Sequence, residues 1–200
     1  MIKNKMNVKN FYNSNSNDFS NTRHSIWDVV KKFNRSINPK SNILDAGCGN
    51  GKNMVYLQNQ GHNMIGIDFS DGLLEICKQK NLNVYNSDIR NLPFNDFTFD
   101  YVISIAVIHH LNTEEDRIKA INELLRVTKK GGKVLFTMWA LEQDDLSKRK
   151  MILGDNYVPF KGITRYYHIY NKDGVINLTH TFKVDDIFYD KSNWNVILVK

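Results

Sequence analysis

The sequence of 200 residues contains only two cysteines, Cys48 and Cys77. Two cysteines cannot build a disulfide framework or a cysteine-rich zinc motif, so we expect a reducing compartment and no bound metal. No apolar run is long enough to span a bilayer, and the polar N-terminus has no apolar signal-peptide region. We therefore expect a protein of the cytoplasm, with the nucleus as a second location, and no membrane partner.

The charge balance favours a polyanionic partner. Twenty-seven Lys and Arg residues stand against 21 Asp and Glu residues, which gives a formal net charge of +6. Contacts to nucleic-acid phosphates come from such basic side chains, although a soluble protein that is simply rich in lysine has the same balance. The hydrophobic content of 42% and the chain length fit one globular domain.

Strands and helices alternate over the first two thirds of the chain. Apolar spacing predicts helices over residues 25–37, 52–60, 71–79 and 113–127, and strands over 43–45, 64–68, 82–85, 99–105 and 133–139. Thr113 precedes three acidic residues and is the expected N-cap of the last of these helices. This alternation predicts a Rossmann-like α/β fold with a mostly parallel sheet.

The pattern changes after residue 141. We expect an N-terminal helical cap over residues 1–40, a core over 41–141, a lid-like irregular insertion over 142–162 and C-terminal strands over 163–200. The predicted strands of that last part cover 165–170, 175–184 and 195–199, with a hairpin turn at 171–174. The end of the sheet is therefore predicted to be antiparallel.

A glycine-rich loop follows the first predicted strand, where ligands bind in open α/β sheets. Its sequence from Asp45 to Gly51 is D-A-G-C-G-N-G. A dinucleotide loop requires a third glycine or alanine where Lys52 stands, and a phosphate-binding P-loop requires a glycine where Ala46 stands. An acid followed by G-x-G-x-G matches fully, so the loop resembles that of class I S-adenosyl-L-methionine (SAM)-dependent methyltransferases.

Acidic residues also follow the next two strands. Asp68 ends the second strand, where a carboxylate accepts hydrogen bonds from ribose hydroxyls. The resemblance implies that Asp88 and Ile89 meet the adenine and that Asp45 lies near the methionine end. The residues expected to bind the cofactor are Asp45, Gly47, Gly49, Asn50, Gly51, Asp68, Phe69, Ser70, Asp88, Ile89 and Ile105.

The end of the fourth strand carries the acceptor chemistry in this fold, and here it reads S-I-A-V-I-H-H from Ser104 to His110. The chain lacks the [ND]-P-P-[YF] motif that clamps an amine, and neither cysteine is placed as a nucleophile for pyrimidine methylation. These absences argue against base methylation and favour an acceptor that needs little activation.

Six further segments resemble one family, the tRNA methyltransferases that esterify 5-carboxymethyluridine at the wobble position. This family includes the methyltransferase domain of the eukaryotic AlkB-type tRNA hydroxylase. The matching segments are 19–25, 104–110, 139–143, 155–159, 165–168 and 190–194. The resemblance implies SAM as cofactor, the tRNA anticodon loop as partner and a small zinc-binding activator subunit at a sheet edge, with Leu82 and Val84 as contacts.

A carboxymethyl group is a carboxylate at neutral pH and needs no general base. Arginine binds a carboxylate with two hydrogen bonds, so Arg23 is our first candidate for the acceptor site and Arg165 the second. We expect His110 to donate to the carboxylate or to a uracil carbonyl, with His109 pointing elsewhere. Asn193 is expected to read a base edge.

Aromatic side chains and a basic run complete the predicted RNA site. Two of the four aromatics Trp139, Tyr166, Tyr167 and Trp194 are expected to stack on anticodon bases, and the others to lie in the core. The basic run 148–150 is a candidate phosphate contact, or a solvated charge run. Two other functions stay open: a methyltransferase for a small molecule such as a quinone or a carboxylic acid, and a non-catalytic SAM-binding subunit.

Overall fold

The computed structural model describes residues 8–21, 25–143, 151–160 and 163–200. The helices are α1 (Val8–Ser14), α2 (Ser16–Asn21), α3 (Asp28–Asn34), α4 (Lys52–Asn59), α5 (Asp71–Gln79), the 3-10 helix η1 (Ile108–His110), α6 (Glu114–Val127) and α7 (Lys172–Thr179). The strands are β1 (Asn42–Ala46), β2 (Asn63–Asp68), β3 (Val84–Asn86), β4 (Phe99–Ser104), β5 (Thr128–Trp139), β6 (Gly154–Phe160), β7 (Ile163–Ile169), β8 (Val184–Asp190) and β9 (Asn193–Val199).

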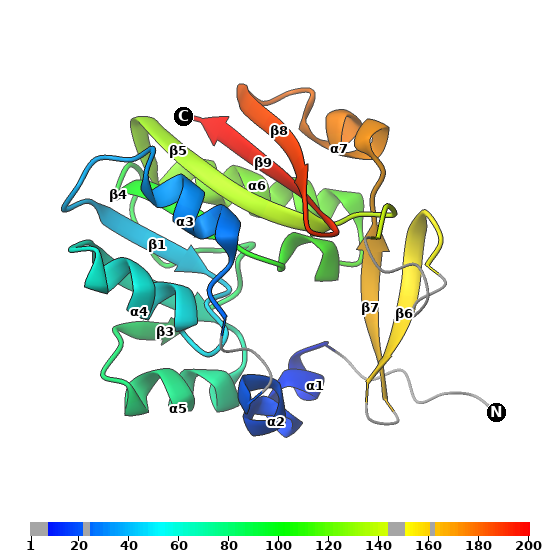
Figure 1. Cartoon of the computed structure of the whole chain (residues 1–200), viewed down its shortest axis with the longest axis horizontal. Helices are drawn as coiled ribbons and strands as arrows, with labels where there is room; N and C mark the ends of the chain where they lie inside the picture. The colour runs from blue at the N-terminus through cyan, green and yellow to red at the C-terminus, as the bar shows by residue number, and fades with distance from the viewer. Residues whose placement is uncertain (1–7, 22–24, 144–150, 161–162) are drawn as a thin grey trace.

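Seven of the described strands form the central sheet, in the order β3-β2-β1-β4-β5-β9-β8 (Figure 1). The first five run parallel, β9 runs antiparallel to β5, and β8 runs antiparallel to β9. This arrangement confirms the predicted Rossmann-like fold with antiparallel C-terminal strands. Strands β3 and β8 lie at the two edges of the sheet.

Helices cover both faces of the sheet, because successive strand residues point to opposite sides. On β1, Ile43 packs with Phe33 of α3 and Met54 of α4, whereas Leu44 packs with Leu124 of α6. Thr113 caps α6 as predicted, since its side chain accepts a hydrogen bond from the Asp116 N–H at 3.1 Å. Within the described residues, no helix is both long and apolar enough to cross a membrane.

The C-terminal part differs from the prediction in three elements. The strand predicted over 175–184 is wrong: residues 175–179 belong to helix α7, and β8 begins only at Val184. The predicted hairpin turn at 171–174 is also wrong, because the Asn171 side chain accepts a hydrogen bond from the Gly174 N–H at 2.9 Å and caps that helix. The antiparallel hairpin is formed instead by β8 and β9, through Lys191 and Ser192, both with positive φ.

The segment predicted to be irregular contains a regular strand in its described part. Strand β6 pairs with β7 in a separate two-stranded ribbon that lies outside the central sheet (Figure 1). The residues of β7 therefore do not extend the sheet as predicted. The ribbon stands beside the carboxyl ends of the parallel strands, and it contributes Arg165 and Tyr167 to the cavity described next.

Candidate active site

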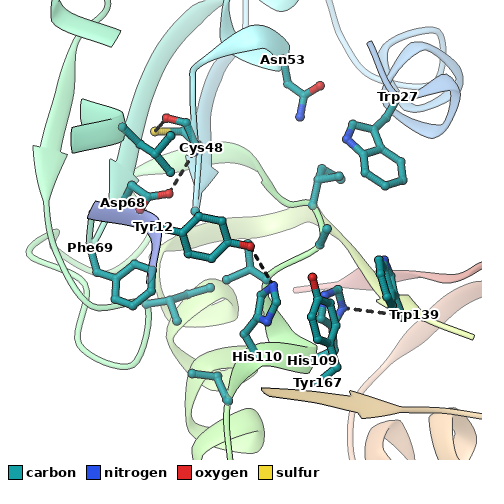
Figure 2. A pocket seen from close by; sticks show the side chains of 18 of the residues that line it. Tyr12, Trp27, Cys48, Asn53, Asp68, Phe69, His109, His110, Trp139 and Tyr167 are labelled. Atoms are coloured by element: carbon teal, nitrogen blue, oxygen red, sulfur yellow. Dashed lines mark hydrogen bonds between the residues drawn. The ribbon is translucent and has the colours of Figure 1, made fainter. Parts of the chain in front are cut away.

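A cavity of about 540 Å³ lies at the carboxyl ends of the parallel strands (Figure 2). The glycine loop, the end of β2 and the segment after β3 line one half. Residues after β4, the ribbon strand β7 and the β8–β9 turn line the other half. Helix α1 contributes Tyr12, which lies between the two halves. A donor molecule and an acceptor group thus have room to meet in one space.

The glycine loop is held by the end of strand β2. The Gly47 and Cys48 N–H groups donate to the Ile67 carbonyl at 2.8 Å, and Gly49 N–H donates to Asp68 Oδ2 at 2.9 Å. Gly47 has a φ of 86°, and a Cβ atom there would lie 2.3 Å from Val107 Cγ2. Only glycine fits this position, where backbone conformation and close packing both exclude a side chain.

Most of the predicted cofactor residues line the cavity. They are Gly47, Gly49, Asn50, Asp68, Phe69, Asp88, Ile89 and Ile105. Three others, Asp45, Gly51 and Ser70, do not line it. Gly51 occupies the N-cap of α4 with a positive φ, and Ser70 caps α5 by accepting from the Leu73 N–H, so both support the loops rather than face a ligand.

Asp45 is a buried carboxyl group directly behind the loop. Neither of its oxygens has a hydrogen-bond partner among the described residues. Burial raises its pKa to about 8, and the negative charge of Asp68 adds to this shift. Burial also raises the pKa of Asp68 to about 6, while backbone N–H groups of Ser70 and Gly49 oppose the shift.

These two carboxyl groups fit SAM, whose sulfonium and ammonium groups are positive. A buried carboxylate without a cation is costly, and a positively charged ligand offsets that cost. Both Asp68 oxygens accept backbone hydrogen bonds, and a carboxylate has about four acceptor sites, so Asp68 can still accept from a ribose hydroxyl. The glycine loop, the two acids and the cavity therefore suit this cofactor.

Asp88 is held in a fixed orientation on the cavity wall. Arg90 donates to both of its carboxylate oxygens and also donates to Asp116 at 2.9 Å. The hydrogen bonds from Arg90 lower the pKa of Asp88, so the group is ionised at neutral pH. An ionised and oriented acceptor at this position is compatible with the adenine contact that the family resemblance implies.

The acceptor half contains three of the five predicted residues, His110, Arg165 and Asn193. Trp194 does not line the cavity: it packs in the core, and its indole N–H donates to Glu142 Oε2 at 3.0 Å. Arg23 lies outside the described residues, as does the basic run 148–150. Arg165 is therefore the predicted arginine that the structure brings to the acceptor half, with 3% of its surface exposed.

His110 donates at one ring nitrogen and accepts at the other in the described site, and its donation to the acceptor group stays a prediction. Its Nδ1 lies 2.9 Å from the Tyr166 carbonyl oxygen, so this nitrogen carries the proton. Burial, with the positive charge of Arg165, lowers the pKa of His110 to about 4, so the ring is neutral at pH 7. Its Nε2 then has a lone pair only, and the hydroxyl of Tyr12 at 3.2 Å donates to it.

Three flat side chains form a stack beside the acceptor half. The rings of Trp139 and Tyr167 are 4.3 Å apart, and Tyr167 stacks on His109 at 5.1 Å (Figure 2). His109 is fully buried and accepts from the Trp139 N–H at 3.3 Å. Of the four aromatics singled out from the sequence, Trp139 and Tyr167 line the cavity, whereas Tyr166 and Trp194 do not.

Sequence reasoning missed Tyr12, Trp27 and Asn53, which also line the cavity. Tyr12 comes from helix α1, and Trp27 from the segment before α3. The signal for Tyr12 was an aromatic pair, Phe11 and Tyr12, within an otherwise polar N-terminal stretch.

Comparison with known proteins agrees with the geometry. A family model described as a methyltransferase domain matches residues 44–136. The chain is 47% identical over 140 residues to the tRNA (carboxymethyluridine(34)-5-O)-methyltransferase of Arabidopsis thaliana, which covers 70% of this chain but only 34% of that relative. It is 35% identical over 221 residues to the enzyme of the same name from Schizosaccharomyces pombe, covering 96% of both chains.

A solved structure supports the fold alone. A chain in the complex between the Haloferax volcanii Trm112 methyltransferase activator and a methyltransferase superposes with a TM-score of 0.74 at 14% identity, covering 96% of both chains. The fold and the site together define a class I SAM-dependent methyltransferase. More narrowly, the chain belongs to the tRNA (carboxymethyluridine(34)-5-O)-methyltransferase family.

Proposed function

We propose that this protein transfers a methyl group from SAM to the carboxylate of 5-carboxymethyluridine at the wobble position of tRNA. One observation carries the proposal: Arg165, a buried arginine, lines the same cavity as the glycine loop. A buried cation facing a ligand site favours an anionic ligand, and the guanidinium geometry matches a carboxylate. The names and coverage of the two relatives support the same substrate.

The reaction requires alignment rather than proton transfer. When bound, SAM supplies an electrophilic methyl carbon, and the carboxylate oxygen forms a bond to it as the carbon–sulfur bond breaks and S-adenosylhomocysteine leaves with the electron pair. Arg165 holds the carboxylate, and the neutral His110 neither removes nor supplies a proton. Such positioning contributes up to roughly 7–11 kcal/mol to lowering a barrier.

The cavity also suits a pyrimidine. Asn193 Oδ1 is buried and has no hydrogen-bond partner among the described residues, so it is available to accept from the uracil N3–H. The stacked pair of Trp139 and Tyr167 offers a flat apolar wall for a splayed base. These contacts favour a nucleoside carboxylate over a flexible aliphatic acid.

The decisive experiment uses tRNA that contains carboxymethyluridine, methyl-labelled SAM and the protein with its activator. Mass spectrometry of the nucleosides should detect the labelled methyl ester. Arg165→Lys keeps the charge but loses the two-pronged hydrogen bonding, so we expect kcat/KM to fall about tenfold or more. Calorimetry should show SAM affinity unchanged within about twofold.

Arg35→Lys is the matched control, because Arg35 is exposed at the end of α3 and lies outside the cavity. Absence of ester with both proteins present would reject the function. Equal losses of turnover and SAM affinity in Arg165→Lys would assign Arg165 to the cofactor. Ester formed on free carboxylic acids but not on tRNA would identify a small-molecule methyltransferase.

We also propose that an activator subunit docks along strand β3. This strand pairs only with β2 among the described residues and lies at one edge of the sheet. Ser87 N–H and the Asn83 carbonyl bond to β2, so the alternating residues Val84 and Asn86 present their backbone groups outward. Leu82 is buried in the core cluster, so of the two contacts inferred from the sequence only Val84 remains.

A further inference from the structure

Helix α1 lies between helix α5 and the ribbon of β6 and β7 (Figure 1). On the cofactor side, Asn13 Oδ1 accepts a hydrogen bond from Ser70 Oγ at 2.9 Å, and Phe11 packs in a cluster with Leu73 of α5. On the acceptor side, the ring of Phe11 lies 4.7 Å from the guanidinium carbon of Arg165. One short helix is thus fixed to the segment after β2 and to the ribbon strand β7.

A directional series of hydrogen bonds passes through the hydroxyl of Tyr12. Arg165 Nη1 lies 3.4 Å from this oxygen and can only donate to it. The single hydroxyl proton of Tyr12 then goes to His110 Nε2 at 3.2 Å (Figure 2). The other ring nitrogen of His110 donates to the Tyr166 carbonyl.

The guanidinium of Arg165 is also enclosed by rings. Its central carbon lies 4.7 Å from the ring centroid of Phe11, 5.3 Å from that of Tyr167 and 6.0 Å from that of Tyr12. Aromatic rings attract a flat cation and limit its tilt. They do not fix its rotation within its own plane, which requires a hydrogen-bond acceptor at one edge. The Tyr12 oxygen is such an acceptor.

We propose that Tyr12 is a positioning residue for methyl transfer: its hydroxyl fixes the direction of the Arg165 guanidinium and, by donating to Nε2, holds the His110 ring in place. The proposal rests on the proposed function, since the aligned group is the acceptor carboxylate that Arg165 binds. Tyr12 acts through these two residues and needs no bond to the transferred methyl group.

The test is Tyr12→Phe, which removes one oxygen atom. The ring contacts of Tyr12 with Phe11 and Phe69, at 5.2 and 6.4 Å, do not involve that oxygen, so we expect the variant to fold. The kcat for ester formation should fall about 10- to 100-fold, as expected for a misaligned group. The KM for tRNA and the Kd for SAM should change by less than about twofold.

Tyr56→Phe is the matched control, because Tyr56 of α4 does not line the cavity. Its kcat should equal that of the wild type. A wild-type kcat in Tyr12→Phe would overturn the proposal. A loss confined to SAM affinity or to the KM for tRNA would overturn it as well, because Tyr12 would then serve ligand binding.

A second measurement does not depend on activity. In protein with ¹⁵N-labelled histidine, His110 should show a protonated Nδ1 and a hydrogen-bonded Nε2, and Tyr12→Phe should shift the Nε2 resonance. Identical Nε2 resonances in wild type and Tyr12→Phe would overturn the proposal. If the wild type forms no ester on tRNA, the proposed function fails, whereas this spectroscopic result still reports on Tyr12.

Discussion

Asp45 makes the stability of the cofactor-free protein depend on pH. Its pKa is raised from 3.8 to about 8, so the folded protein holds a proton that the unfolded chain releases near pH 4. The resulting stabilisation is complete below about pH 4 and is lost as pH rises through about 8. Each such proton changes the free energy of unfolding by about 1.4 kcal/mol per pH unit.

We therefore predict that Asp45→Asn flattens the pH dependence of unfolding between pH 6 and 8. Asp68 contributes little in this range, because its pKa of about 6 places its own loss at lower pH. Urea unfolding of cofactor-free protein at pH 6, 7 and 8 measures the effect. Asp186→Asn, at an exposed position on β8, should keep the wild-type slope. An unchanged slope in Asp45→Asn would show that Asp45 is ionised in the folded state.

The donor half of the site could be predicted from the sequence because its residues lie close together along the chain. Strand, loop and helix follow one another from β1 to α4, and the later acids Asp68 and Asp88 end or follow strands of the same sheet. Tyr12 could not be predicted in this way, since it is separated from His110 by 98 positions and from Arg165 by 153. Its place depends on how α1 docks, which local periodicity does not encode.

At the level of elements, the secondary-structure predictions failed where a residue type is common in two kinds of element. Asn, Asp and Gly at 171–174 are typical of a hairpin turn, but the same asparagine side chain caps a helix. The short apolar run after Gly174 fits either a strand or a helix. The helix forms because it lets Val175 and Leu178 pack against the α6 side of the sheet. Strand β6 was missed because Gly154 and Pro159 interrupt its pattern, and the two-stranded ribbon tolerates both.

The exposed edge at β3 leads to a prediction about assembly. Val84→Pro removes an outward-facing backbone N–H, so activator binding should fall about tenfold or more, because pairing along an edge depends on such groups. Val184→Pro, on the opposite edge strand β8, is the control and should bind the activator normally. Pull-down and calorimetry measure both. Normal binding by Val84→Pro, with its fold intact by circular dichroism, would place the activator elsewhere.

At the level of the whole molecule, the net charge of +6 predicts salt-dependent RNA binding. Raising NaCl from about 50 to about 200 mM should weaken tRNA binding about tenfold or more, because released counterions lose their entropic advantage. SAM affinity should change less than about twofold over the same range. Fluorescence anisotropy with labelled tRNA and calorimetry with SAM provide the two values. A tRNA affinity that is independent of salt would exclude phosphate contacts as its main source.

The position of α1 has a thermodynamic consequence for the two ligands. Because Phe11 and Tyr12 contact both the segment after Asp68 and the arginine of the acceptor half, order imposed on this helix by one ligand is already present for the other. Linkage of this kind is reciprocal: the factor by which bound tRNA raises SAM affinity equals the factor by which SAM raises tRNA affinity. Dissociation of S-adenosylhomocysteine then also lowers the affinity of the protein for the esterified tRNA.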